Sequence, residues 1–190
     1  MKKVVISLGG SIIIPNEVNY KYLKKFSKFI EKFSHKNKVV IVAGGGITAR
    51  KYIEGLKKIN SNEWALSSVG IFSTRLNATL VSGIFGLSKE IPNNLNDVKK
   101  SLRNNNLVIC GALGMQKDMT SDGNAAEIAE MIKADYLINM TNVKGLYDKN
   151  PKTCKTAKFI PSISFKDFKA RINKIKFKAG QHFVLDQSAA

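Results

Sequence analysis

The fold of this chain is decided by residues 39–50, VVIVAGGGITAR, which join a buried strand to a helix through three consecutive glycines. The segment Val39–Ala43 is apolar and rich in β-branched residues, a pattern typical of a buried strand. From Ile47 onward, apolar residues recur at helical spacing and lysines fill positions between them. Gly44–Gly46 permit positive φ and place no side chain in the way of a ligand. The corner therefore predicts either an anion site at a helix N-terminus or only a tight turn.

Two further features favour the anion site. Arg50 lies about one helical turn beyond the glycines, and its planar guanidinium can hold two phosphate oxygens at once. A second corner of the same kind follows the apolar strand Lys3–Leu8, where Gly9 and Gly10 precede Ser11. Parallel strands place both corners at the same edge of a sheet, which suggests a donor and an acceptor of a phosphoryl group. Neither corner has the spacing of a Walker loop or of a dinucleotide fingerprint.

The composition suits a globular domain with a strongly basic surface. The chain has 190 residues, of which 44% are hydrophobic, and 31 Lys and Arg against 14 Asp and Glu give a net charge of +17. Such a charge suggests nucleic-acid binding, but the lysines of the first predicted helix simply occupy the face opposite its apolar stripe. That stripe consists of Leu23, Phe26, Ile30 and Phe33. Because the chain also lacks a helix-turn-helix, zinc-knuckle or RNA-binding strand motif, we expect no dedicated nucleic-acid partner.

The sequence also predicts a cytoplasmic protein without a membrane partner. No apolar run is long enough to cross a bilayer, and the N-terminus passes from Lys2 and Lys3 directly into a strand, unlike a signal peptide. The two cysteines, Cys110 and Cys154, show no metal-ligand spacing with each other or with histidine and acidic residues. We therefore expect reduced thiols in an intracellular enzyme and no metal ion held by the protein alone.

The remaining sequence continues the alternation of strands and helices. Residues 107–110 and Tyr136–Met140 are apolar strands, and Thr120–Asp122 open a helical run whose N-terminus carries two hydroxyl groups. These polar residues either cap the helix or bind a substrate. The polar segment Gly86–Asn106 predicts a surface excursion between strands. The whole pattern predicts an α/β fold with a mainly parallel sheet.

Taken in order along the chain, these segments resemble the amino acid kinase family, and within it the archaeal type of uridylate (UMP) kinase. The matching segments are VVISLGGS (4–11), VVIVAGGGITARKYI (39–53), VGIFSTRLNATL (69–80), the long run 120–160 and FVLDQSAA (183–190). The resemblance implies the amino acid kinase fold, a three-layer α/β/α sandwich with a mainly parallel central sheet. It also implies a single domain over residues 1–190, with an acceptor-binding lobe at approximately 1–119 and an incomplete ATP-binding lobe at 120–190.

The resemblance implies a kinase that moves the γ-phosphoryl group of ATP, bound with Mg²⁺, onto UMP for pyrimidine nucleotide biosynthesis. The second pKa of a phosphate ester is near ~6, so the attacking oxygen is already ionised and needs no general base. Catalysis can then rest on alignment and charge neutralisation. Two alternatives stay open, namely another small phosphate or carboxylate as acceptor and a nucleotide-binding protein without turnover. Because relatives pair through the helix at the place of Val69–Ile84, a homo-oligomer, either a dimer or a hexamer, is expected.

The resemblance assigns site residues position by position. Arg50 is expected to be catalytic, beside the transferred phosphoryl group. Asp122 either organises the hydroxyls before it and Mg²⁺ or only caps its helix. The expected ATP-binding residues are Gly10, Ser11, Gly46, Arg50, Thr141, Tyr147 and Asn150. The expected acceptor-binding residues are Gly45, Ser67, Gly114, Thr120 and Ser121.

The sequence departs from the family pattern at four places, one of which is the loop Gly111–Asp122, where the Pro-Gly pair of relatives is missing. Ser67 stands where the family usually has an aspartate that holds the UMP ribose, and a hydroxyl attracts a ribose less strongly than a carboxylate does. Lys144 and Asn150 each replace an aspartate near the expected ATP, which removes negative charge there. These departures leave the identity of the acceptor open, but not the type of reaction.

The end of the sequence carries its own prediction. Phe183–Leu185 ends a strand or approaches a helix, Asp186 is a good N-cap, and Gln187–Ala190 has the pattern of a first helical turn. A single turn is not stable alone, and relatives continue with that helix and at least one more strand. We therefore expect a C-terminally incomplete form of a kinase with an open sheet edge. In this form, acceptor binding is expected to be retained better than ATP binding.

Overall fold

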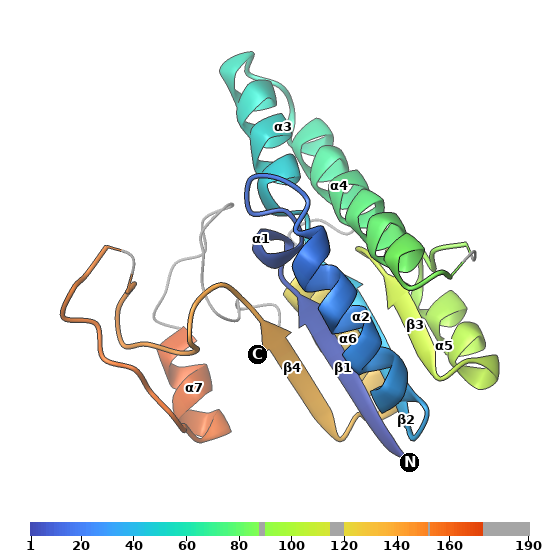
Figure 1. The fold of residues 1–190 in the computed structure, drawn as a ribbon. Coiled ribbons are helices and arrows are strands. Elements are labelled where there is room, and N and C mark those ends of the chain that lie inside the picture. The colour runs from blue at the N-terminus through green and yellow to red at the C-terminus, as the bar shows by residue number, and fades with distance from the viewer. Residues whose placement is uncertain (88–89, 115–119, 152, 173–190) are drawn as a thin grey trace.

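The computed structural model describes residues 1–87, 90–114, 120–151 and 153–172. At the centre of this part of the chain lies a four-stranded, all-parallel sheet with the strand order β3-β2-β1-β4 (Figure 1). The strands are β1 (Lys2–Leu8), β2 (Asn37–Ala43), β3 (Leu107–Cys110) and β4 (Tyr136–Met140). They contain the four apolar segments that the sequence predicted as strands, and their carboxyl ends share one edge of the sheet.

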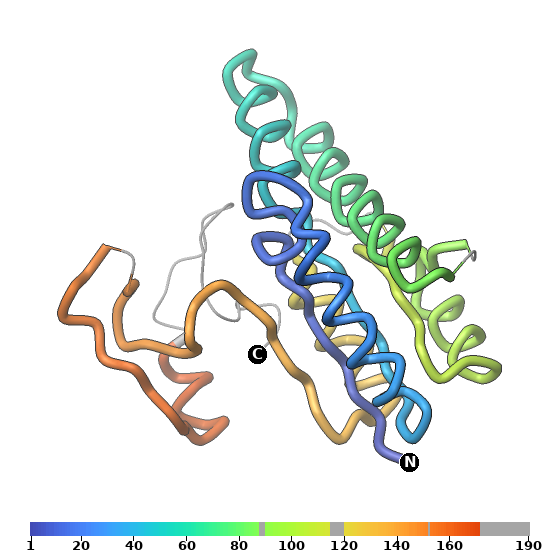
Figure 2. The backbone as a smooth tube through the Cα atoms, viewed as in Figure 1, coloured from blue at the N-terminus to red at the C-terminus, as the bar shows by residue number. Residues whose placement is uncertain are grey.

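Helices cover both faces of this sheet. The helices are α1 (Gly10–Ile13), α2 (Tyr20–Ser34), α3 (Gly46–Lys58), α4 (Glu63–Ile84), α5 (Leu95–Asn104), α6 (Ser121–Ile132) and α7 (Phe165–Ile172). Helices α2 and α4 pack on one face, whereas α5 and α6 pack on the other (Figure 2). This is the predicted three-layer α/β/α sandwich. Within the described ranges, no helix combines the length and the apolar character that a membrane span requires.

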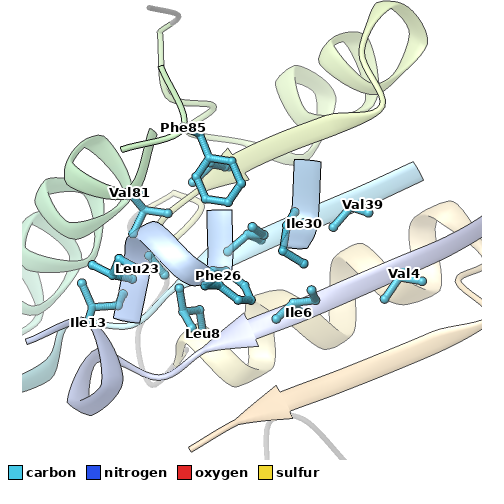
Figure 3. Packing of buried hydrophobic residues seen from close by; sticks show 14 residues of the cluster. Val4, Ile6, Leu8, Ile13, Leu23, Phe26, Ile30, Val39, Val81 and Phe85 are labelled. Carbon is cyan, nitrogen blue, oxygen red and sulfur yellow. The ribbon is translucent and has the colours of Figure 1, made fainter. Parts of the chain in front are cut away.

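Two apolar cores hold the three layers together. The first core lies between the sheet and α2 and α4, and its buried side chains include Val4, Ile6, Leu8, Leu23, Phe26, Val39, Val81 and Phe85 (Figure 3). The second core lies on the opposite face and includes Val5, Val40, Val98, Val108 and Ile128. Since both faces of the sheet are covered, its strands have uninterrupted apolar sequences rather than alternating ones.

The polar segment Gly86–Asn106 is more than a surface excursion, and the prediction was wrong in this respect. It contains α5, and Asn94 is the N-cap residue of this helix. Oδ1 of Asn94 accepts a hydrogen bond of 3.0 Å from the N–H of Asp97. Val98 and Leu102 are buried against the sheet. The helix was missed because its buried apolar face has only about one residue in each turn, and the residues between are polar.

The chain leaves the sheet after β4, which is one of the two edge strands of the described sheet and exposes its side chains at residues 136–138. Residues 141–151 and 153–164 form an excursion on the side of the sheet away from α3 and α4 (Figure 1). A backbone hydrogen bond of 3.0 Å from Asp148 to Lys158 closes part of this excursion. The predicted strand end and helix start at residues 183–190 lie outside the described residues. The division into two lobes stays a prediction.

Candidate functional site

The two glycine corners meet at the carboxyl edge of the sheet. A Cβ atom on Gly10 would lie 2.0 Å from the backbone N of Gly46 and 2.4 Å from its Cα. Gly46 has a φ of +63°, and a Cβ there would lie 2.5 Å from the carbonyl O of Gly10. Only glycine allows such an approach from both sides. The corner before Ser11 and the corner at residues 44–46 therefore lie together at one edge of the sheet. This arrangement was expected from parallel strands.

The N-terminus of α6 reaches the same place. A Cβ on Gly44 would lie 2.7 Å from the backbone N of Gly10 and 3.4 Å from Oγ of Ser121. Oγ1 of Thr120 accepts a hydrogen bond of 3.0 Å from a backbone N–H in the first turn of α6. The observed cap of the helix is therefore Thr120 rather than Asp122, while the Ser121 hydroxyl lies beside the glycine corners.

The carboxylate of Asp122 points from α6 toward β1. Its Oδ1 accepts a hydrogen bond from Oγ of Ser7, with 2.5 Å between the two oxygens. Ser7 is 1% exposed and lies next to the last residue of β1. This contact places a carboxylate at the carboxyl edge of the sheet, near the glycines. No sequence pattern indicates a role for Ser7, since a lone serine within an apolar strand looks like part of the core.

The N-terminus of α3 offers donors to an anion. Gly45 is its N-cap residue and provides no side-chain cap. No hydrogen bond joins the N–H groups of Gly45 and Gly46 to any residue that the structure describes. Arg50 is half-buried about 6 Å of helix rise beyond Gly46, and its guanidinium has no hydrogen bond or ion pair with another described residue. Together these groups can bind a phosphate.

Side chains of α4 and α6 hold the loop that follows β3. Thr74 Oγ1 accepts a hydrogen bond of 2.7 Å from the N–H of Ala112, and Nε of Arg75 donates to the carbonyl of Ala112 at 3.1 Å. On the other side, Oδ1 of the fully buried Asn124 accepts a hydrogen bond of 2.9 Å from the N–H of Leu113. The loop is thus fixed between α4 and α6, next to the glycine corners.

A third polar side chain of α4, that of Asn77, contacts the glycine corner directly. Its Nδ2 donates to the carbonyl O of Gly44 at 2.7 Å and to that of Gly45 at 3.1 Å. Unlike Ser67 on the same helix, Thr74, Arg75 and Asn77 were not predicted as site residues from the sequence. The signal that points to them is a group of polar residues on the buried face of an otherwise apolar helix, where capping cannot explain them.

The remaining acceptor residues predicted from the sequence lie at or near this edge. Ser67 is half-buried on α4, one turn before Gly70, whose carbonyl O would lie 3.6 Å from a Cβ on Gly45. Gly114 lies in the loop after β3 with a φ of +74°, and its N–H donates to the carbonyl of Asn93 at 2.8 Å. The binding roles of Ser67 and Gly114 stay predictions.

The predicted ATP-binding residues fall into two groups. Thr141 follows β4, whose last carbonyl accepts a hydrogen bond of 2.9 Å from the N–H of Gly9, so Thr141 adjoins the first corner. Tyr147 belongs to the excursion after β4 and packs edge-on against Phe159, with 5.5 Å between the ring centroids. Asn150 is exposed at the start of a turn in the same excursion. The described contacts do not bring Tyr147 or Asn150 to the glycine corners.

The two thiols differ in character, and neither contacts the corners in the described structure. Burial raises the pKa of Cys110 to about 12, so this thiol stays protonated in the core. A hydrogen bond from the Thr156 hydroxyl lowers the pKa of Cys154 in the excursion after β4. Among the described residues, His, Cys, Asp and Glu form no group of three that could hold a metal ion.

Residues 2–190 match the model of the Amino acid kinase family. The chain is 36% identical over 189 residues to the uridylate kinase of Archaeoglobus fulgidus, covering 99% of this chain and 84% of that protein. It is 34% identical over 192 residues to the uridylate kinase of Methanoregula boonei, covering 100% of this chain and 81% of that protein.

Solved structures show the same likeness. The crystal structure of uridylate kinase from Archaeoglobus fulgidus superposes with a TM-score of 0.84 at 33% identity, covering 100% of this chain and 84% of that one. The UMP kinase of Ureaplasma parvum superposes with a TM-score of 0.76 at 21% identity, covering 99% and 83%. The second likeness concerns the fold alone.

Proposed function

The chain belongs to the amino acid kinase family, and we propose that it transfers the γ-phosphoryl group of ATP to UMP, giving ADP and UDP. The observation that carries this proposal is the backbone contact between Gly10 and Gly46. It supports the proposal because two glycine corners lie side by side, as transfer between a donor and an acceptor phosphate would require. The reaction would serve pyrimidine nucleotide biosynthesis in the cytoplasm.

We infer that the two corners bind different substrates. Gly10 and Ser11 would bind the phosphates of ATP, and Gly45 would face the phosphate of UMP. The hydroxyl of Ser121, at the N-terminus of α6 and beside Gly44, would also hold the acceptor. Arg50 would neutralise charge on the transferred group from α3. No general base is needed, since a phosphate ester with a second pKa near ~6 is ionised at neutral pH.

The site fits a magnesium ion that arrives with the nucleotide. Mg²⁺ prefers oxygen ligands and is usually bound by one or two carboxylates together with substrate phosphates. The carboxylate of Asp122, which accepts a hydrogen bond from Ser7 at the sheet edge, would supply such a ligand, and the hydroxyls of Thr120 and Ser121 adjoin it in sequence. Bound with ATP, the ion would neutralise charge on the phosphates.

The nucleoside parts of the two substrates would lie farther out. Thr141, Tyr147 and Asn150 would surround the ATP nucleotide, and Thr141 already adjoins the first corner through the end of β4. On the acceptor side, Gly114 and Ser67 would hold the UMP. Ser67 can bind a ribose hydroxyl as donor or acceptor without the charge of a carboxylate.

With ATP and Mg²⁺ present, we expect UMP to produce ADP about tenfold or more faster than CMP, acetylglutamate or isopentenyl phosphate, because polar groups left unpaired by a wrong acceptor cost binding energy. A coupled assay for ADP measures the rates, and the variant Arg50→Ala, purified in parallel, reports any contaminating kinase. Equal rates with all four acceptors would contradict the assignment of UMP. Nucleotide-dependent thermal shifts without any ADP would instead indicate a binding protein.

We also propose that the chain forms a homo-oligomer, at least a dimer, through the outer face of α4. Phe72 and Leu76 lie one turn apart on this face and are 58% and 60% exposed, although they are large and apolar. The same helix buries Asn77 on its inner face. Apolar side chains exposed together in this way are typical of interaction surfaces.

Light scattering at micromolar concentration is expected to give a mass of at least two chains. The double variant Phe72→Glu with Leu76→Glu is expected to be a monomer, because charged side chains cannot be buried unpaired at an interface. Phe29→Glu is the matched control, since Phe29 is 64% exposed on α2. A monomeric wild-type chain, or equal masses for all three proteins, would contradict this proposal.

A further inference from the structure

Asn77 occupies an unusual position in the middle of α4. Its side chain is fully buried, with 0% exposure, and Nδ2 contacts both carbonyl oxygens at the glycine corner, those of Gly44 and Gly45. Its other polar atom, Oδ1, is also buried and has no hydrogen-bond partner among the described residues. A buried amide oxygen without a partner lowers stability, so stability alone does not explain an asparagine here.

The geometry of the peptide bond shows what these two hydrogen bonds do. Every described peptide bond is trans, so the N–H of each residue points opposite to the carbonyl that precedes it. By holding the carbonyls of Gly44 and Gly45 toward α4, Asn77 turns the N–H groups of Gly45 and Gly46 away from it. Neither of these two N–H groups has a hydrogen-bond partner among the described residues.

Three glycines in a row have more backbone freedom than any other sequence, and an anion site built from them needs a device that orients them. Donors that are already oriented stabilise a transferring phosphoryl group without rearranging during the reaction. The scaffold around Asn77 is itself fixed, because neighbouring Thr74 and Arg75 bind Ala112 in the loop after β3.

We propose that Asn77 is a positioning residue of the kinase site, which aims the N–H groups of Gly45 and Gly46 at the transferred phosphoryl group. It acts through the backbone and does not contact the substrate. This inference rests on the proposed function, since it assumes that a phosphate lies at this corner.

The variant Asn77→Ala tests it against Ser82→Ala. Ser82 lies on the same helix, is also buried, and donates a hydrogen bond of 3.0 Å to the carbonyl of Leu87, away from the corner. Each variant therefore removes a buried side chain that donates a hydrogen bond to a backbone carbonyl. Only Asn77→Ala removes such a donor at the glycine corner. With UMP and ATP, at a temperature where circular dichroism shows both variants folded, Asn77→Ala is expected to lower kcat on the order of tenfold to a hundredfold. Ser82→Ala is expected to retain the wild-type kcat.

Hydrogen exchange gives a second readout that does not depend on turnover. Addition of ATP or UMP is expected to protect the amides of residues 44–50 in the wild type and in Ser82→Ala, and to protect them much less in Asn77→Ala. Equal kcat values and equal protection in the two variants would overturn the inference while leaving the proposed function intact.

A wild type that produces no ADP from UMP would contradict the proposed function instead. In that case the hydrogen-exchange measurement alone tests the inference about Asn77. Loss of ATP-dependent protection in Asn77→Ala alone would uphold it, and absence of protection in the wild type would overturn it.

Discussion

The variant Arg50→Ala is expected to lower kcat/KM on the order of 10²–10⁴, the usual effect of removing one electrostatic partner of a transition state. Arg50 extends from α3 just beyond the free N–H groups of Gly45 and Gly46, and no described residue neutralises its guanidinium. A phosphate ligand would pair with this guanidinium, which has no partner among the described residues. Initial rates with varied UMP and saturating ATP measure the change.

Two companion variants show whether geometry or charge matters at this position. Arg50→Lys is expected to recover only part of the activity, because one ammonium group cannot make a forked contact with two phosphate oxygens. Lys51→Ala removes the same charge from the neighbouring, exposed residue of α3 and is expected to leave kcat/KM unchanged. Near-wild-type turnover in Arg50→Ala would show that the glycine corner serves only the architecture of the fold.

The second large effect is expected for Gly10→Ala, which should destabilise the protein by more than about 4 kcal/mol. The added Cβ would lie 2.0 Å from the backbone N of Gly46 and 2.7 Å from the carbonyl O of Gly44. These atoms belong to the backbone and cannot rotate away as a side chain can, so the two corners must separate. At ~2–4 °C per kcal/mol, the melting temperature should fall by roughly 8 °C or more, and kinase activity should be lost.

Gly55→Ala is the matched control for this experiment. Gly55 is exposed in the interior of α3, and a Cβ there would have no atom within 4 Å. Because alanine is a better helix former, this variant is expected to be ~0.5–1 kcal/mol more stable than the wild type. Thermal unfolding, monitored by circular dichroism, compares the melting temperatures of the two variants. A Gly10→Ala protein that melts with the wild type would mean that the corners do not touch.

Much of the fold could be predicted from local patterns. The apolar runs at residues 3–8 and 39–43 form strands, and the glycines at 9–10 and 44–46 lie at their carboxyl ends as expected. The predicted α/β sandwich and the amino acid kinase family are confirmed. The helix α5 escaped prediction because Val98 and Leu102 are too few to dominate a segment that is otherwise polar.

The candidate site was predictable only in part. The glycines, Arg50 and Thr120 stand out in the sequence because their positions relative to strands and helices are local features. Ser7 and Asn77 do not stand out, since their roles depend on partners 115 and 33 residues away. Whether a serine in an apolar strand fills space or binds a carboxylate is decided by the helix that packs over it.

The sequence by itself determined the strands, the placement of glycine corners after them, the expected parallel sheet and the likeness to a kinase family. The strands and corners depend on hydrophobic periodicity and on glycine's backbone freedom, which act over a few residues, whereas the likeness rests on the matching segments quoted above. Tertiary structure alone decided that Gly10 and Gly46 touch, that Asp122 binds Ser7 while Thr120 caps α6, and that Asn77 orients the second corner. Such contacts join segments that are adjacent only after the sheet has assembled, and close packing then admits one arrangement of them.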